Sequence, residues 1–97
     1  MIEFKIFGKP ACGMCRATKD KVAHLIDKRN VGKQVSLVYF NLDEPDGLAE
    51  AAMEGVTASC LGLPIVVVKI ERQRMAIWDG RVPLEAEIVA FFPKEEG

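Results

Sequence analysis

The sequence lacks three features that would assign a protein class at once: a long hydrophobic run, an excess of one charge, and many cysteines. No apolar stretch approaches the roughly 20 residues that cross a bilayer, so a membrane-spanning protein is not expected. The 13 Lys and Arg residues nearly balance the 14 Asp and Glu residues and are interspersed with them, which predicts no nucleic-acid surface. The 3 cysteines do not form the disulfide framework of a small secreted domain.

The chain is long enough for one compact core. It has 97 residues, of which 49% are hydrophobic, and it is too short for two ordinary domains. We therefore expect residues 1–97 to form a single domain. The chain enters an apolar run directly after Met1 and shows no signal-peptide pattern, so a soluble, cytoplasmic protein is expected, and a monomer is taken as its state.

The first half of the chain predicts a strand, a helix and a second strand. Residues 2–7 are strand-like and are interrupted by Gly8, residues 12–30 have helical spacing and are closed by Gly32, and residues 35–40 are β-branched and aromatic. Three apolar residues of the helix should face the sheet: Val22, Leu25 and Ile26. Two strands joined by a helix should be parallel.

A second helix should follow this unit. Asp43 or Glu44 can cap a helix that Pro45 opens, because proline is well tolerated at the first helical position. Gly55 is the expected end of this helix, although residues 56–59 could add another turn.

The last third predicts a hairpin and a helix. Pro64 opens a strand over residues 65–70, and residues 71–74 form a polar turn. Residues 75–78 form the return strand of the hairpin, and Pro83 begins the final helix. The apolar stripe of that helix consists of Leu84, Ile88, Val89, Phe91 and Phe92. The order β-α-β-α-β-β-α predicts an α/β protein with a four-stranded mixed sheet flanked by three helices, which is the outline of the thioredoxin-like fold.

Cys12 and Cys15 form a C-G-M-C motif where the first strand turns into the long helix. A cysteine in the first helical turn faces free N–H groups and the positive end of the helix dipole, which favour the thiolate. Cys15 lies one turn behind Cys12, within reach of a mixed disulfide on it. The pattern therefore predicts that Cys12 attacks a disulfide and that Cys15 resolves the product.

Three neighbouring residues are candidates for substrate contact. Lys9 could add positive charge near the thiolate or bind a substrate carboxylate, and its alternative is a solvated loop lysine. Gly13 and Met14 leave the dipeptide between the cysteines without charge.

A zinc site is the structural alternative for a C-x-x-C pair, but such a site needs four ligands. Only Cys60 and His24 remain to complete it. His24 is expected on the exposed side of the long helix, and Cys60 is either a small semi-buried residue or a regulatory thiol. No metal site is therefore assigned.

Several segments together resemble the glutaredoxin branch of the thioredoxin superfamily: F-G-K-P-A-C-G-M-C-R-A-T-K, N-L-D-E-P and L-P-I-V-V-V. The segment W-D-G-R-V-P at residues 78–83 is similar to the W-S-G-F-R-P segment of glutaredoxin-like redoxins that donate electrons to ribonucleotide reductase. Three features usual in glutaredoxins are not intact. They are an aromatic residue inside C-x-x-C, a Thr-Val-Pro segment before the third strand, and a Gly-Gly-x-Asp-Asp segment that binds the glutathione carboxylate.

The resemblance implies a glutaredoxin-type domain with Cys12 and Cys15 as its dithiol. It further implies that Pro64 is a cis-proline, that the backbone of Leu63 pairs with the substrate, and that Asp79 contacts it. The implied activity is reduction of protein disulfides by a small dithiol electron carrier. The implied reductant is thioredoxin reductase or glutathione, with no tightly bound cofactor.

Two other functions remain open from the sequence. The same cysteines could hold an iron–sulfur cluster or a soft metal in a binding module. They could instead report oxidation in a sensor or adaptor. Trp78 is likewise either a core anchor or a docking residue.

Overall fold

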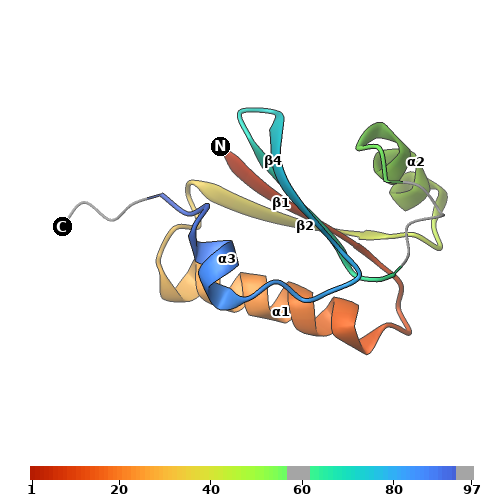
Figure 1. Ribbon diagram of the computed structural model, residues 1–97, viewed down its shortest axis with the longest axis horizontal. Coiled ribbons are helices and arrows are strands. Elements are labelled where there is room, and N and C mark those ends of the chain that lie inside the picture. Colours follow the sequence, from red (N-terminus) through yellow and green to blue (C-terminus); the bar gives the residue numbers. More distant parts are fainter. Residues whose placement is uncertain (57–61, 94–97) are drawn as a thin grey trace.

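A computed structural model describes residues 1–56 and 62–93 of the chain, which contain four strands and three helices (Figure 1). In chain order these are β1 (Ile2–Gly8), α1 (Gly13–Lys28), β2 (Val35–Asn41), α2 (Pro45–Met53), β3 (Ile65–Ile70), β4 (Gln73–Asp79) and α3 (Glu85–Val89). The expected order of elements is confirmed. Within these described ranges, no helix is both long and apolar enough to span a bilayer.

The four strands form one mixed sheet in the order β2-β1-β3-β4. β1 and β2 are parallel, as expected for strands joined by a helical crossover, and β3 is antiparallel to both β1 and β4. Phe7 near the end of β1 pairs with Ile65 at the start of β3, and Ile65 pairs with Asp79 at the end of β4. The loops that follow β1, precede β3 and follow β4 therefore leave the sheet at the same end.

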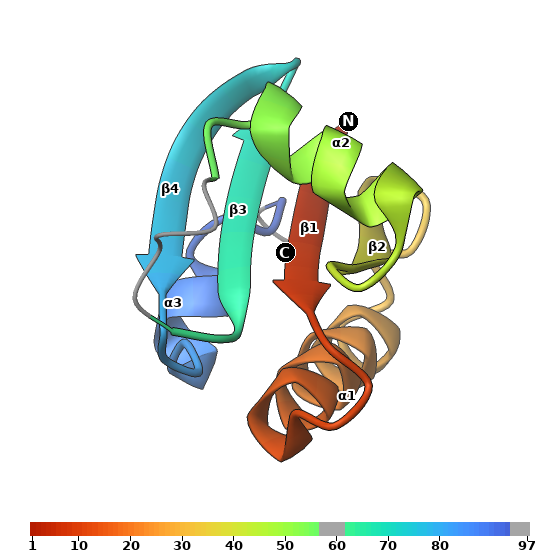
Figure 2. The ribbon, with the colours of Figure 1, turned by 90° about the vertical axis from the view of Figure 1, so that its right-hand side faces the viewer.

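Helices cover both faces of the sheet: α1 and α3 lie on one face and α2 on the other, where it crosses β3, β1 and β2 (Figure 1, Figure 2). The larger core lies under α1 and α3 and includes Phe4, Ile6, Val22, Leu25, Val66, Val68, Trp78 and Ile88. The smaller core lies under α2 and consists of Phe7, Ala51, Val56, Ile65 and Val67. Residues 65–68 alternate between the two cores, which confirms the expected burial of this strand on both faces.

The C-terminal end of α1 differs from the prediction, because Asn30 and not Gly32 takes the left-handed position. Asn30 has φ 55°, its N–H donates to the Asp27 carbonyl at 3.1 Å, and the Val31 N–H donates to the Ile26 carbonyl at 3.2 Å. These two bonds form a Schellman motif. Asparagine tolerates the left-handed region better than most residues, so the helix ends before the glycine is reached.

Both ends of α2 follow from local residues. Pro45 occupies the first turn, and Glu44 is the N-cap residue without a capping bond from its side chain. The side chain of Asn41 instead accepts the Asp43 N–H at 2.8 Å. Gly55, with φ 75°, ends the helix as predicted, and residues 57–59 of the alternative extra turn lie outside the described residues.

The hairpin between β3 and β4 turns more tightly than expected. Its two loop residues, Glu71 and Arg72, have φ 52° and 68°, which is the left-handed pair of a type I′ turn. Arg74 pairs with Lys69 and therefore belongs to β4, so the predicted turn over residues 71–74 was too long.

The final helix is shorter than expected. Pro83 is fully buried in an extended segment, and its carbonyl accepts a hydrogen bond from Lys21 Nζ at 2.7 Å. Leu84 is the N-cap residue and α3 begins at Glu85. Phe92, which was expected on the helix, packs into the core from the segment after it.

Candidate functional site

A disulfide joins Cys12 and Cys15 at the N-terminal end of α1, with their Cα atoms 5.2 Å apart. Cys12 is the N-cap residue, and its Sγ accepts the Cys15 N–H at 3.1 Å. Cys12 is partly exposed, whereas Cys15 is fully buried. The pair thus has one sulfur that a substrate can reach and one that solvent cannot.

The backbone around Cys12 holds this sulfur at the free N–H groups of the helix. A tight turn brings the Cys12 N–H to the Lys9 carbonyl at 3.0 Å, and the Cys12 carbonyl accepts the Arg16 N–H at 3.2 Å. The first turn of α1 has no acidic residue. The positive end of the helix dipole is therefore not neutralised by a carboxylate in that turn, and it favours a thiolate at Cys12.

Gly8, which the sequence marked only as the end of the first strand, is required by the packing of the site. A Cβ at this position would lie 2.6 Å from the Cβ of Cys15, 2.7 Å from its Sγ and 2.6 Å from the hydroxyl oxygen of Tyr39. These distances are shorter than any normal carbon contact. Only glycine allows β1 to pass directly behind Cys15.

Positive side chains surround this end of α1. Arg16 Nη2 donates to the Pro10 carbonyl at 3.3 Å, and Lys19 Nζ lies 5.7 Å from the centre of the Tyr39 ring. Lys9 is exposed and its Nζ lies 3.7 Å from Asp43 Oδ1, so an exposed carboxylate offsets part of its charge. Burial raises the pKa of Tyr39, and the nearby Arg16 partly opposes that shift.

The residues between the cysteines form an exposed rim. Met14 is 50% exposed, and a Cβ on Gly13 would meet no atom within 4 Å. The two positions therefore have space for a docked substrate chain. Gly13 would also accept a larger side chain, such as the aromatic residue usual in glutaredoxins.

The other predicted contact residues lie at the same end of the sheet. The Leu63–Pro64 peptide bond is cis, and Pro64 is buried while Leu63 is half-buried. The Gly80 N–H donates to the Pro64 carbonyl at 2.9 Å, which holds exposed Asp79 beside this bond. The structure thus gathers all the predicted contact residues at the end of the sheet where β1 leads into the dithiol.

The remaining sequence candidates do not join the site. His24 is exposed on α1, as predicted, and Cys60 lies outside the described residues. Trp78 is 8% exposed in the larger core, and its indole Nε1 donates to Glu87 Oε2 at 3.1 Å, so it is a core anchor. Over residues 1–56 and 62–93, no group of three or more His, Cys, Asp and Glu side chains is placed to hold a metal ion.

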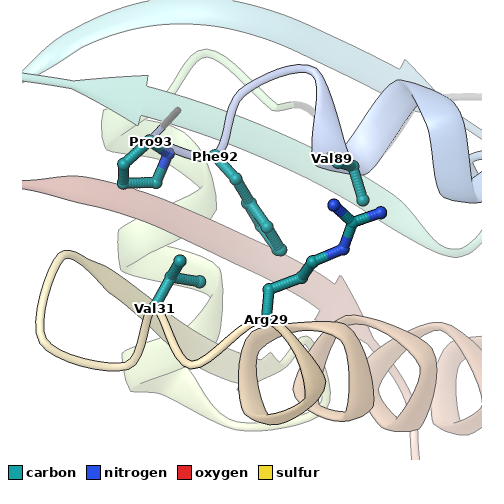
Figure 3. A pocket seen from close by; sticks show the side chains of 5 residues that line it. All are labelled: Arg29, Val31, Val89, Phe92 and Pro93. Carbon is teal, nitrogen blue, oxygen red and sulfur yellow. The ribbon is translucent and has the colours of Figure 1, made fainter. Parts of the chain in front are cut away.

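A small cavity of about 170 Å³ lies at the opposite end of α1. Figure 3 shows the Arg29 side chain extending from that end of the helix toward Val89 of α3, beside the ring of Phe92. Val31 and Pro93 complete the lining. The length of α1 separates this cavity from the dithiol.

A network of partly buried charges that the sequence did not predict lies under α2. Lys5 Nζ on β1 donates to Glu50 Oε1 at 2.7 Å and to Glu54 Oε2 at 2.6 Å, and Lys69 Nζ donates to the same Glu54 oxygen at 3.0 Å. Burial lowers the pKa of Lys5, but its bonds to the two carboxylates outweigh this and the net shift is upward. Burial raises the pKa of Glu54, and its bonds from the two lysines reverse the shift to a net lowering.

Comparison with known proteins shows that this architecture is thioredoxin-like. No protein-family model matches the chain, and no curated protein matches its sequence. Thioredoxin O2 from Arabidopsis thaliana in the oxidized state is similar, with a TM-score of 0.76 and 17% identity over 96% of this chain and 76% of that one. A mutant thioredoxin from Halobacterium salinarum has a TM-score of 0.70 and 17% identity over 97% of this chain and 77% of that one.

Thioredoxin-2, a component of malaria parasite protein secretion machinery, has a TM-score of 0.69 and 19% identity over 93% of this chain and 79% of that one. These likenesses show that the fold is thioredoxin-like: a four-stranded mixed sheet with three helices. They do not confirm the glutaredoxin branch that the sequence motifs resemble.

Proposed function

We propose that this protein is a small dithiol electron carrier that reduces disulfides in protein substrates by thiol–disulfide exchange. The observation that carries the proposal is the Cys12–Cys15 disulfide at the N-terminal end of α1, with one sulfur partly exposed and the other fully buried. The thioredoxin-like fold supports it, because the loop from β1 to the dithiol and the residues before β3 lie at the same end of the sheet.

The exchange runs in two displacements. The Cys12 thiolate attacks one sulfur of the substrate disulfide, a Cys12–substrate disulfide forms, and the other substrate sulfur leaves as a thiolate. Cys15 then passes its proton to the substrate thiolate released first and attacks Cys12 Sγ, which forms the Cys12–Cys15 bond and releases the second substrate thiolate. Two electrons pass from the dithiol to the substrate, whose second thiolate takes up a proton from solvent.

The end of the sheet around the dithiol supplies the proposed substrate contacts. Gly13 and Met14 form the exposed rim, and the backbone of Leu63 before Pro64 offers hydrogen-bonding groups to an extended substrate chain. Lys9 and Asp79 provide one charge of each sign at the margins, where they act on substrate choice.

The oxidised dithiol needs an electron donor to return to its reduced form. We take thioredoxin reductase or glutathione as the electron donor, with no tightly bound cofactor and with a monomer working in a reducing, cytoplasmic compartment. Residues 78–83 resemble a segment of glutaredoxin-like redoxins that are recharged by thioredoxin reductase, which supports this enzyme as the donor. The Gly-Gly-x-Asp-Asp segment with which glutaredoxins bind the glutathione carboxylate is not intact, which makes glutathione the second choice.

NADPH-coupled reduction of insulin tests the function with two cysteine variants. Cys12→Ser should lose turnover completely, because no nucleophile remains, whereas Cys15→Ser should still attack and should accumulate a mixed disulfide visible by mass spectrometry. His24→Ala, an exposed position of α1 outside the proposed contacts, is the matched control and should retain turnover. Full activity of Cys12→Ser would refute the proposal.

The same assay separates the two reductants. Oxidised protein is supplied with NADPH and thioredoxin reductase in one arm, and with NADPH, glutathione and glutathione reductase in the other. Turnover with the reductase alone would identify a reductase-fed redoxin, and dependence on glutathione would identify a glutaredoxin.

A further inference from the structure

The hydroxyl group of Tyr39 on β2 faces the buried sulfur of Cys15 across the missing side chain of Gly8. A Cβ on Gly8 would lie 2.6 Å from the Tyr39 hydroxyl oxygen and 2.7 Å from Cys15 Sγ. Because both atoms lie within 2.7 Å of one point, their separation cannot exceed twice that distance. The parallel register, in which Tyr39 pairs with Ile6 and Asn41 with Gly8, places the tyrosine on the face that α1 covers.

This hydroxyl is available as a donor. In the disulfide form it donates to the Lys9 carbonyl at a long 3.4 Å. Burial raises the pKa of Tyr39 above its ordinary value of 10.0, so the group keeps its proton throughout the neutral range. A phenol that stays protonated can donate a hydrogen bond to a thiolate but cannot serve as its base.

The surroundings of Cys15 provide few other polar groups. In the described part of the chain the buried polar or charged side chains are Lys5 and Thr18. Lys5 lies on the α2 face, and the Thr18 hydroxyl donates to the Met14 carbonyl at 2.7 Å. The charged side chains around this end of the sheet include Lys9, Asp43 and Glu44 in the loops, Arg16 and Lys19 on α1, Asp79 on β4 and Arg81 after it, all of them exposed. A thiolate at fully buried Cys15 therefore depends on a neutral donor.

We propose that the Tyr39 hydroxyl donates a hydrogen bond to Cys15 Sγ as this sulfur becomes a thiolate, and that it thereby positions and stabilises the resolving nucleophile. The inference rests on the proposed exchange function and assigns a role in its second displacement only. The Cys15 S–H bond breaks and its proton passes to the substrate thiolate released in the first displacement, while Tyr39 keeps its own proton. The new S–S bond forms to Cys12, and the electron pair of the broken bond leaves with the substrate sulfur.

Tyr39→Phe removes only the oxygen and leaves the ring, so packing is preserved. A hydrogen bond to a charged group is a strong one, and its loss should slow resolution roughly tenfold at neutral pH. The midpoint of the resolution rate against pH should move up by about one pH unit, since more hydroxide is needed to form the same fraction of thiolate. A purely structural role for Tyr39 would not move this midpoint.

Stopped-flow reaction of the reduced chain with an aromatic disulfide that releases a coloured thiolate resolves both steps. The first coloured thiolate reports attack by Cys12, and the second reports resolution by Cys15. Tyr39→Phe should leave the first phase unchanged and slow the second. Lys19→Met, which removes the cation over the same ring and keeps the hydroxyl, is the matched control and should alter the second phase less than about twofold.

The outcomes distinguish the two proposals. Absence of the first phase in the unmodified chain would refute the exchange function itself. Two normal phases in the unmodified chain, together with an unchanged second phase and unchanged pH midpoint in Tyr39→Phe, would overturn the role of Tyr39 while leaving the function intact. Thermal unfolding of Tyr39→Phe should match the unmodified chain within a few degrees.

Discussion

The two faces of the sheet are held by different forces. Under α1 and α3 lies the larger, apolar core, which includes Phe4, Val22, Leu25 and Ile88. Under α2 the apolar core is small, and four charged side chains of low exposure form a network: Lys5, Lys69, Glu50 and Glu54. The helix that carries the dithiol thus rests mainly on apolar contacts, which do not titrate, whereas the opposite helix is held by ion pairs, which do.

This difference separates redox chemistry from pH-dependent stability. α2 has nine residues and contributes buried Ala51 as its main apolar contact, so it cannot be held by area alone. Ion pairs of low exposure fix its register at the cost of sensitivity to protonation. The position of α1, and with it the geometry of Cys12, should not change when that network is protonated.

Leu25→Ala should have the largest effect on stability, because it removes most of a side chain that is 3% exposed in the larger core. We expect a loss of about 3–4 kcal/mol in the free energy of unfolding. The loss should be the same at neutral pH and near pH 4, since no charge is involved. Urea unfolding at both pH values measures it, and a strongly pH-dependent loss would contradict the apolar assignment of this face.

Lys5→Met should have a somewhat smaller effect at neutral pH, about 2–3 kcal/mol, because Glu50 and Glu54 lose their shared cation in a site of low exposure. The loss should shrink in acid. The pKa of Glu54 is lowered from 4.5, so its contribution is present above pH 4.5 and disappears as the pH falls through the lowered value. The pKa of Lys5 is raised from 10.5, so the contribution of its charge to stability is fully present below pH 10.5 and is lost as the pH rises through the raised value.

Urea unfolding of Lys5→Met between neutral pH and about pH 3 measures this dependence. Lys33→Met, which removes an exposed lysine before β2, is the matched control and should change stability by less than about 0.5 kcal/mol. The rate at which Cys12 reacts should be unchanged in Lys5→Met, and a change there would show that the two faces are coupled.

The combined change Glu71→Asn and Arg72→Gly should have the smallest effect and the opposite sign. Both residues have positive φ, which Asn-Gly adopts at lower cost in a two-residue hairpin. We expect a gain of about 1 kcal/mol, reduced by loss of the exposed bond between the N-terminus and Glu71. Thermal unfolding checks it, and a loss of stability would contradict the turn geometry.

Much of the fold follows from sequence because its signals are local. The apolar runs, the turn residues and Pro45 determine the order of elements and the parallel pairing of β1 with β2. The predictions from the sequence are wrong where two local signals compete. Asn30 ends α1 before Gly32, and Glu71 with Arg72 makes a turn that usually needs asparagine and glycine. Phe92 packs into the core from the segment after α3, so the predicted apolar stripe extended beyond the end of the helix.

The dithiol is likewise predicted from neighbouring residues of the sequence. The roles of the groups around it depend on contacts between separate elements, which the sequence does not show. Gly8 is a strand end in sequence, and only the approach of α1 shows that a side chain there would collide with Cys15. Tyr39 could have been placed on the α1 face from strand alternation and parallel register, but not beside a particular sulfur. Lys5 in an otherwise apolar strand could have indicated a partly buried carboxylate partner.

The most direct test of the central claim is a redox titration of the whole chain in dithiothreitol buffers at low potentials and glutathione buffers at higher ones, with free thiols trapped and located by peptide mass spectrometry. The account predicts one two-electron transition in which Cys12 and Cys15 lose their thiols together, at a potential within the range of about −270 to −120 mV known for dithiol oxidoreductases. Independent oxidation of Cys12 and Cys15, or a pair that stays reduced across this range, would contradict it.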